Sequence, residues 1–172
     1  MAVKQILTEP NKFLRQISKP VEKVGDEERK LMDDMLDTMY AAPGIGLAAI
    51  QIGIPKRIIV MDISRDENKK EPLYFVNPVI KNKNENKSRY EEGCLSVPDQ
   101  FAEIERPKTC EVEYLDYYGK KQILKAEGLL ATCIQHEIDH LEGILFIDYL
   151  SKLKKSMIIK KLSKFKSERI IV

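Results

Sequence analysis

The only two histidines of the chain, His136 and His140, lie four residues apart in the pentapeptide His-Glu-Ile-Asp-His. On an α-helix this spacing places the two imidazoles about 40° apart around the axis and about 6 Å apart along it, so both can bind one metal ion. Glu137 lies roughly 100° from His136, beside the ion, where the general base for a metal-activated water is needed. The H-E-x-x-H pattern therefore predicts a metal-dependent hydrolase site.

A catalytic site of this kind needs a third protein ligand and an open position for water. Cys133 shares the helical face of the histidines, but it lies about 7 Å along the axis from their midpoint, too far for a metal–sulfur bond of about 2.3 Å. Cys110 belongs to an alternating strand pattern and is interpreted as a small buried side chain. Cys94 remains, and the adjacent Gly93 lets the backbone approach closely. Cys94 is therefore the expected third ligand.

The elements that must position these residues follow from apolar periodicity and from turn residues. Helical spacing predicts helices at 27–41, 128–142 and 151–167. Short β-like runs predict strands at 57–63, 73–80, 109–118 and 122–125, with a surface loop at 81–87 and a hairpin turn at Tyr118 and Gly119. Strands followed by helices, without regular alternation, indicate an α+β protein. We expect a single domain over residues 1–172, with antiparallel β-sheets packed around the metal-binding helix and a C-terminal helix.

Composition excludes several other classes of protein. The 172 residues are 43% hydrophobic and 33% charged, which is typical of a globular domain and argues against disorder, collagen and a coiled coil. The longest apolar runs, such as 44–50, are too short to span a membrane. The three cysteines are an odd number, their spacing is not that of a disulfide framework, and no signal peptide is recognised. These features favour a protein of the reducing cytosol.

Charge is unevenly distributed although the net charge is only +2. Residues 151–172 hold eight basic residues and one acid, a net of +7, whereas the first 150 residues hold 21 basic and 26 acidic residues, a net of −5. One interpretation is a solvated amphipathic helix that packs Leu153, Met157 and Leu162 on the core. The other is a basic surface for phosphate groups of nucleic acid, with salt-sensitive binding.

Three segments together resemble the peptide deformylase family. They are Gly-Ile-Gly-Leu-Ala-Ala-Ile-Gln at 44–51, Glu-Gly-Cys-Leu-Ser at 92–96 and Gln-His-Glu-Ile-Asp-His-Leu-Glu-Gly at 135–143. All three are complete and in the family's order, and the similarity covers nearly the whole chain. The resemblance implies hydrolysis of the N-formyl group from the initiator methionine of new polypeptides.

The resemblance also implies which residues perform the reaction. Cys94, His136 and His140 would hold one divalent metal ion together with a water; Fe²⁺ is the ion implied, although zinc, nickel and cobalt also suit such ligands. Glu137 would take a proton from the attacking water and deliver it to the departing amine. The side-chain amide of Gln51 and the backbone N–H of Leu95 would donate to the formyl oxygen.

A pocket for the methionine side chain is expected beside the metal. Leu129 and Cys133 fall on the same helical face as the two histidines, which makes that face partly apolar. By resemblance, the substrate-binding residues are Ile45, Leu129 and Cys133, with Tyr90 as a wall and Gly44 and Gly46 pairing with the substrate backbone. Glu92 and Arg106 resemble a supporting polar pair. Phe101 stands where some family members carry arginine.

Two alternative functions make different predictions. A zinc endopeptidase also uses H-E-x-x-H, but it takes a third ligand downstream and cleaves internal peptide bonds, so loss of Cys94 would leave its metal bound. A metal-stabilised binding module without catalysis would not need Glu137, and it would unfold when its metal is removed. The presence of both Glu137 and Gln51 argues against the binding module. For the deformylase, the expected partners are N-formylmethionyl nascent peptides and the ribosome, with no membrane, in the bacterial cytoplasm.

Overall fold

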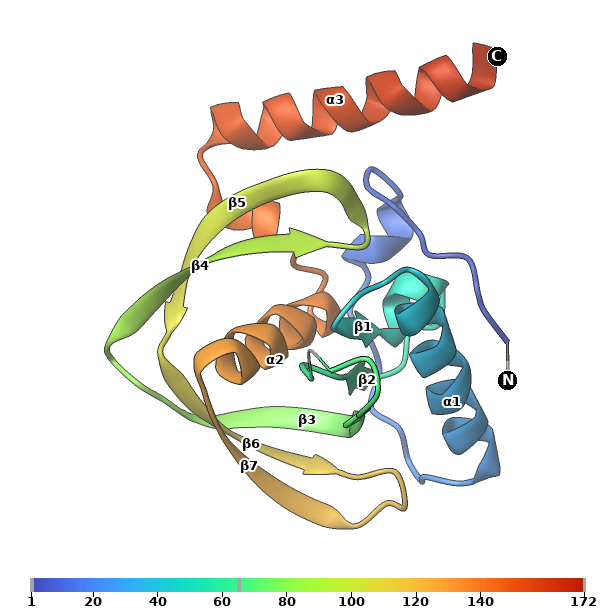
Figure 1. Cartoon of the computed structure of the whole chain (residues 1–172), viewed down its shortest axis with the longest axis vertical. Helices are drawn as coiled ribbons and strands as arrows, with labels where there is room; N and C mark the ends of the chain where they lie inside the picture. Colours follow the sequence, from blue (N-terminus) through green and yellow to red (C-terminus); the bar gives the residue numbers. More distant parts are fainter. Residues whose placement is uncertain (1, 65, 172) are drawn as a thin grey trace.

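The computed structural model describes residues 2–64 and 66–171, and only the backbone of 165–171. Seven strands and three α-helices are found in this part of the chain, and Figure 1 shows α2 at the centre with strands on both sides of it. The strands are β1 (Gly46–Ala48), β2 (Ile58–Met61), β3 (Leu73–Lys83), β4 (Lys87–Cys94), β5 (Val97–Pro107), β6 (Thr109–Leu115) and β7 (Lys121–Glu127). The α-helices are α1 (Asp26–Ala41), α2 (Gly128–Leu141) and α3 (Lys152–Ile171), and the 3₁₀ helices are η1 (Lys12–Arg15), η2 (Ala49–Ile52) and η3 (Phe146–Tyr149).

The strands form two antiparallel sheets. One has five strands in the order β1-β2-β3-β6-β7, and the other is the hairpin of β4 and β5. Because β3 pairs directly with β6, the β4–β5 hairpin is inserted in the sequence between two neighbouring strands of the larger sheet. The predicted α+β fold with antiparallel sheets around the metal-binding helix is confirmed.

Helix α2 is fixed between the sheets because most of its side chains are buried there. Its side chains Ala131, Ile134 and Leu141 are fully buried and belong to one core cluster with Phe75 and Val112 of the five-stranded sheet. Full burial of side chains the size of Ile134 and Leu141 contributes roughly 1.5–3 kcal/mol each. The helix that carries both histidines is therefore among the most firmly held elements of the fold.

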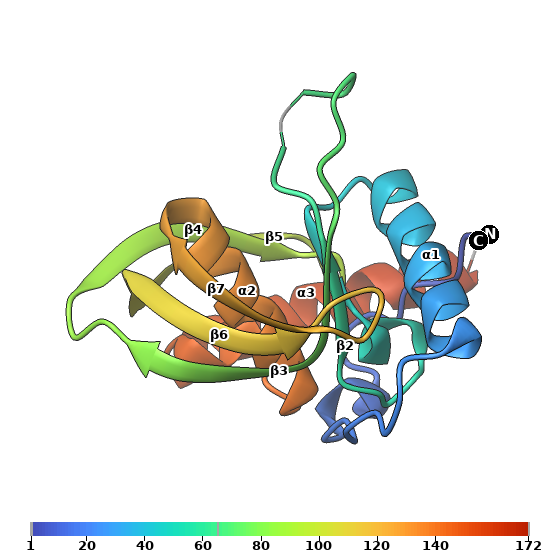
Figure 2. The same cartoon turned by 90° about the horizontal axis from the view of Figure 1, so that it is seen from below.

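Helix α1 covers the other face of the sheet. Met32, Met35 and Met39 recur at helical spacing, are fully buried, and pack in a second cluster with Ile58 and Val60 of β2. In Figure 2, the connection between β2 and β3 projects away from this packed body as a long hairpin. The sheet is therefore covered by α2 on one face and by α1 on the other.

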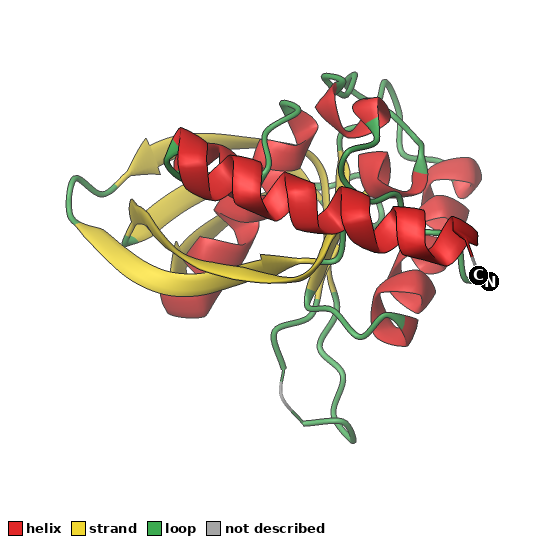
Figure 3. Cartoon of the chain, turned by 90° about the horizontal axis from the view of Figure 1, so that it is seen from above, coloured by secondary structure: helices red, strands yellow, loops and turns green. Residues whose placement is uncertain are grey.

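Helix α3 begins one residue later and ends four residues later than predicted, and Figure 3 shows it lying across the body of the protein. Ile158 and Leu162 are buried in a third cluster with Val97. The prediction that Leu153 and Met157 pack on the core is wrong, because their side chains are 72% and 52% exposed. The side chains of α3 that reach the core are therefore those at positions 158 and 162. The side chain of Phe165 lies outside the described residues. Within the described part of the chain, none of the helices has the length and apolar character needed to cross a membrane.

The surface loop predicted at 81–87 is shorter than expected. Strand β3 continues to Lys83 and β4 begins at Lys87, so only residues 84–86 connect them. Asn84 forms this short turn by accepting a hydrogen bond from the backbone N–H of Asn86 at 2.8 Å. The polar composition that suggested a loop belongs instead to exposed strand ends.

Replacing Gly143 by alanine is expected to lower the free energy of unfolding by about 2 kcal/mol or more. Gly143 ends α2 with φ +74°, a region that costs a residue with a side chain about 1–2 kcal/mol. A Cβ there would also lie 2.4 Å from the backbone oxygen of Arg15. Gly53→Ala is the matched control, because Gly53 has φ +85° but open space around it. Urea unfolding that shows equal losses for the two variants would contradict the prediction.

Candidate metal centre

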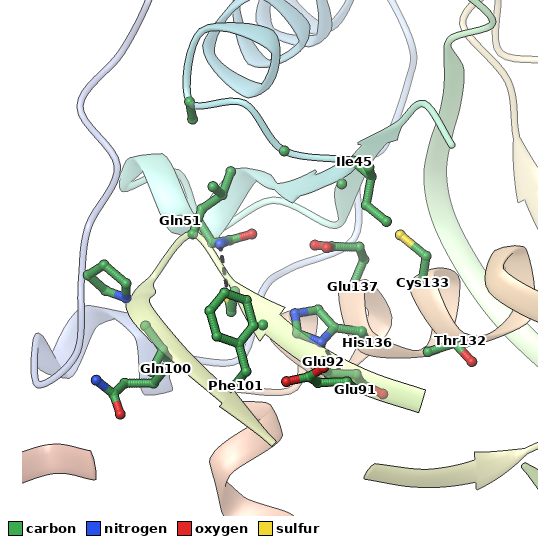
Figure 4. A pocket seen from close by; sticks show the side chains of 18 of the residues that line it. Ile45, Gln51, Glu91, Glu92, Gln100, Phe101, Thr132, Cys133, His136 and Glu137 are labelled. Atoms are coloured by element: carbon green, nitrogen blue, oxygen red, sulfur yellow. Dashed lines mark hydrogen bonds and ion pairs between the residues drawn. The ribbon is translucent and has the colours of Figure 1, made fainter. Parts of the chain in front are cut away.

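A cleft of about 570 Å³ lies between α2, β1 and the β4–β5 hairpin. Figure 4 shows His136, Glu137 and Cys133 projecting from α2 into this cleft, with Gln51 and Ile45 on the facing wall. The three sequence motifs therefore meet in one place, because each occupies a different wall of the cleft. Motif 44–51 supplies β1 and η2, motif 92–96 supplies the end of β4, and motif 135–143 supplies α2.

Cys94, His136 and His140 each bring one donor atom to a common point. The three donor atoms lie within 4.8 Å of one another, and Cys94 Sγ lies 3.3 Å from His140 Nε2. A tetrahedral ion with typical metal–nitrogen and metal–sulfur bonds would hold such a pair about 3.5 Å apart. The donor set and its spacing therefore fit a metal ion, as predicted for these three residues. Cys133 is not part of the group, and Cys110 is buried in the core, as expected.

A buried charge network orients His136 from behind. His136 Nδ1 lies 2.9 Å from Glu92 Oε1, and Glu92 accepts two hydrogen bonds from Arg106, at 2.7 and 3.0 Å. Arg106 also donates to Asp139 at 2.8 Å. When Nδ1 carries the proton and donates it to Glu92, the lone pair of Nε2 faces the cleft. Glu92 and Arg106 form the supporting pair that was expected, and Asp139 extends it.

The electrostatics of the centre favour a bound cation. Burial alone would raise the pKa of Glu92, but hydrogen bonds from His136 and Arg106 hold it below its ordinary value, so Glu92 stays ionised. Burial lowers the pKa of His140 well below its ordinary value, which leaves a neutral ring able to ligate a metal. Burial likewise opposes protonation of His136, but Cys94 and Glu92 raise its pKa well above the ordinary value. Surroundings that attract a proton to this ring also attract a metal ion.

Glu137 is a buried carboxyl group with an unused oxygen. Its Oε2 has no hydrogen-bond partner among the described residues, and its other oxygen lies so close to β1 that a Cβ on Gly46 would come within 2.6 Å of it. Burial is the main reason that the pKa of Glu137 rises to about 7. A carboxyl group with this pKa exchanges a proton readily near neutral pH, as a general base and acid must.

Gln51 presents its amide group to the same point from η2. Its Oε1 accepts a hydrogen bond from the backbone N–H of Ala48 at 2.9 Å, which fixes which way the amide faces. Its Nε2 donates to Ser96 Oγ at 3.0 Å and lies 3.6 Å from Cys94 Sγ. The amide is thus an oriented donor beside the metal ligands. Leu95, the other expected donor, lies in the turn between Cys94 and Ser96.

All six residues predicted to bind substrate line the cleft. They are Gly44, Ile45, Gly46, Tyr90, Leu129 and Cys133. Gly44 lies against Leu95, since a Cβ at position 44 would be 2.6 Å from Leu95 Cδ1. The sequence did not reveal that Ser96 anchors Gln51 or that the ring of Phe146 stacks on His136 at 6.1 Å between centroids. Ser96 belongs to the second motif, and this could have indicated its contact with Gln51. Nothing in the sequence singled out Phe146.

The fold and the candidate metal group define a metal-dependent hydrolase built on an H-E-x-x-H helix. Comparison with known proteins narrows this class. The model of the polypeptide deformylase family matches residues 3–156. A peptide deformylase of Pelagibacter ubique is 88% identical over 172 residues, which is 100% of each chain. The crystal structure of peptide deformylase from Ehrlichia chaffeensis is 45% identical, covers 96% of this chain and 97% of its own, and has a TM-score of 0.91.

The chain belongs to the polypeptide deformylase family. The family removes the N-formyl group from nascent peptides, and this chain is a hydrolase of that kind. A second structure of the Ehrlichia chaffeensis protein, in complex with actinonin, is 48% identical to this chain, with a TM-score of 0.90 and coverage of 95% of this chain and 98% of its own.

Proposed function

We propose that Cys94, His136 and His140 hold one divalent metal ion and that Glu137 carries the proton in the removal of formyl from N-formylmethionyl peptides. The observation that carries the proposal is the convergence of three metal-ligating atoms within 4.8 Å beside a buried glutamate with an unpartnered oxygen. The structure of a relative with actinonin bound supports a ligand site in the same family.

Fe²⁺ is the proposed physiological ion. Two imidazoles and one thiolate suit ferrous iron, and they also suit zinc, nickel and cobalt, so availability in the cell decides between these ions. A bound ion of this type lowers the pKa of water and polarises a carbonyl group. Elemental analysis of protein purified without oxygen is expected to find iron at about one atom per chain. The same stoichiometry of zinc under those conditions would contradict the assignment.

Glu137 moves one proton twice in the proposed reaction. Its ionised carboxylate takes a proton from water as the water oxygen bonds to the formyl carbon. The resulting glutamic acid then gives this proton to the methionine nitrogen as the carbon–nitrogen bond breaks. The products are formate and a peptide with a free amino terminus. A pKa of about 7 serves both steps, because neither form of the carboxyl group is strongly favoured near neutral pH.

Gln51 and Leu95 stabilise the negative charge that develops on the formyl oxygen. Gln51→Leu is expected to lower kcat by about 10²- to 10³-fold, because leucine keeps the volume and removes the oriented N–H donor. Gln122→Leu, an exposed position on β7 outside the cleft, is the control and should retain wild-type kcat. Formate release from formyl-Met-Ala-Ser measures the effect. A kcat within about threefold of wild type in Gln51→Leu would remove Gln51 from the oxyanion site.

The methionine side chain is placed on the apolar face of α2. Leu129, Cys133 and Tyr90 line the cleft together with His136. Ile45 lies opposite Cys133 in Figure 4. Gly44 and Gly46 flank Ile45 at the start of β1, which has a sheet neighbour only on its β2 side and so offers backbone groups to an extended peptide. An unbranched methionine side chain suits such a cleft, since it buries apolar area without a polar atom.

Cys94→Ser is expected to weaken metal binding by more than about a hundredfold, because serine replaces a thiolate ligand by a poor hydroxyl donor. Cys110→Ala is the control, since Cys110 is buried in the core and is not part of the metal group. Equilibrium dialysis against zinc, followed by elemental analysis, measures the difference. A zinc endopeptidase would keep its metal in Cys94→Ser, so unchanged binding would favour that function.

Formate release tests the function directly. Metal-loaded protein should release formate from formyl-Met-Ala-Ser and should leave the internal peptide bonds of acetyl-Met-Ala-Ser-amide intact. Removal of the metal by a chelator should stop formate release without unfolding the protein, as followed by circular dichroism. Cleavage of internal bonds would support an endopeptidase. A metal-loaded protein that hydrolyses neither peptide and unfolds when the metal is removed would support a binding module.

We also propose that α3 holds the enzyme to the ribosome in the bacterial cytoplasm. Lysines dominate its exposed surface, and residues 151–172 carry a net charge of +7. Such a helix neutralises phosphate groups of ribosomal RNA, and the relatives named above are bacterial proteins. Truncation at Ser151 should abolish salt-sensitive co-sedimentation with ribosomes. A folded truncated protein that binds as well as the full chain would contradict this role.

A further inference from the structure

Two large apolar side chains are exposed at the cleft that contains the candidate metal centre. Phe101 on β5 is 65% exposed, and Ile45 next to β1 is 44% exposed. Both line the cleft. The methionine position proposed above uses Ile45 together with α2, but it leaves the outer face of the Phe101 ring exposed. An exposed aromatic ring gains free energy when a ligand covers it.

The ring of Phe101 lies against Gly93, the residue before the proposed metal ligand Cys94. A Cβ on Gly93 would come within 2.6 and 2.7 Å of two ring carbons, so glycine at this position lets the ring pack directly against the backbone. In Figure 4, Phe101 lies away from Cys133, with His136 and Glu137 between them. The ring is therefore held on the far side of the reacting centre from the methionine pocket.

Charge around Phe101 is negative. Glu91 and Asp99 line the same cleft and are exposed, and no lysine or arginine lines it among the described residues. A carboxylate on the substrate would meet two like charges here with no basic partner. An uncharged aromatic or large apolar side chain would instead cover the ring without that repulsion.

We propose that Phe101 forms a subsite for a large apolar or aromatic side chain on the residue that follows methionine. This inference rests on the proposed function, because it assumes that the formyl group is at Cys94, His136 and His140 and that methionine is on α2. An extended chain then continues past Gly93 toward the ring. The preferred substrates are formyl-Met-Phe and similar sequences, and formyl-Met-Asp sequences are disfavoured.

Three peptides test the subsite: formyl-Met-Phe-Ser, formyl-Met-Ala-Ser and formyl-Met-Asp-Ser. Wild-type kcat/KM should be about tenfold higher for the phenylalanine peptide than for the alanine peptide, and lowest for the aspartate peptide. In Phe101→Ala, the ratio between the phenylalanine and alanine peptides should fall to about one. Ile123→Ala is the control, since Ile123 is also 61% exposed but lies on β7 outside the cleft. It should keep the wild-type ratio.

Product binding separates failure of the subsite from failure of the proposed function. Calorimetry with the metal-loaded protein should show tighter binding of Met-Phe-Ser than of Met-Ala-Ser, and Phe101→Ala should remove the difference. If wild type hydrolyses none of the formyl peptides, the proposed function is wrong, and this binding difference still decides the subsite. Equal wild-type values for the two peptides, or a preference that survives in Phe101→Ala, would overturn the inference.

Discussion

Glu137→Gln should reduce kcat for formyl-Met-Ala-Ser by about 10³-fold or more while metal content stays at the wild-type level. Glutamine keeps the size of the side chain and the contact with Gly46, but it cannot accept a proton from water. The carboxyl group is buried and has an oxygen with no partner in the described part of the chain, so no neighbouring group replaces it. Formate release and elemental analysis on the same sample measure the two quantities.

The control for this prediction is Glu142→Gln at the end of the same helix. Glu142 forms an ion pair with Arg57 at 2.7 Å, and it is outside the cleft. This variant should retain wild-type kcat within about twofold, since no transition-state contact is removed. If Glu137→Gln keeps kcat within about tenfold of wild type with its metal bound, Glu137 does not carry the proton.

Arg106→Met should have the largest effect on stability, a loss of about 3–5 kcal/mol in the free energy of unfolding. Methionine fills much of the volume of arginine, but it leaves the Glu92 carboxylate buried without its bidentate partner. The pKa of Glu92 should then rise, because burial is no longer opposed by Arg106. Urea unfolding at neutral pH measures the loss.

Two further variants show that the loss comes from the stranded carboxylate. Arg29→Met removes an exposed pair in which Asp26 is fully accessible, and it should cost about 0.5 kcal/mol or less. The double variant Arg106→Met with Glu92→Leu should recover much of the stability lost by Arg106→Met, since the stranded Glu92 carboxylate is removed and Asp139 keeps its hydrogen bond from Tyr149. A double variant as unstable as the single one would mean that Arg106 stabilises the fold by packing alone.

The helices were predictable because their apolar residues repeat with a clear helical period. Met32, Met35 and Met39 on α1 and the buried face of α2 follow this pattern. Strands β4 and β5 were not predicted, because the inward side chains at 92 and 106 are a glutamate and an arginine. Their mutual ion pair replaces the apolar contacts that an alternating pattern would reveal. The burial of these two charges is a property of the three-dimensional arrangement.

The metal group was predictable from spacing and from elimination, since His136 and His140 are the only histidines and the other two cysteines were unsuitable. The orientation of each side chain was not. Gln51 faces the centre because Ala48 and Ser96 hold its amide, and Phe101 lies in the cleft because Gly93 leaves space for its ring. The contact between Gln51 and Ser96 joins residues 45 positions apart, which no local pattern encodes.

The order of the strands has a consequence for how the enzyme is made. Residues 84–108 leave the large sheet and return to it, since β3 pairs with β6, so the β4–β5 hairpin can form early from neighbouring residues. Its cysteine acquires histidine neighbours only when α2 docks between the sheets. During synthesis, the thiol therefore emerges well before the two histidines that complete the candidate metal group. The candidate metal group is complete only when residues 94, 136 and 140 have all been made and brought together, so a chain that ends before α2 lacks it.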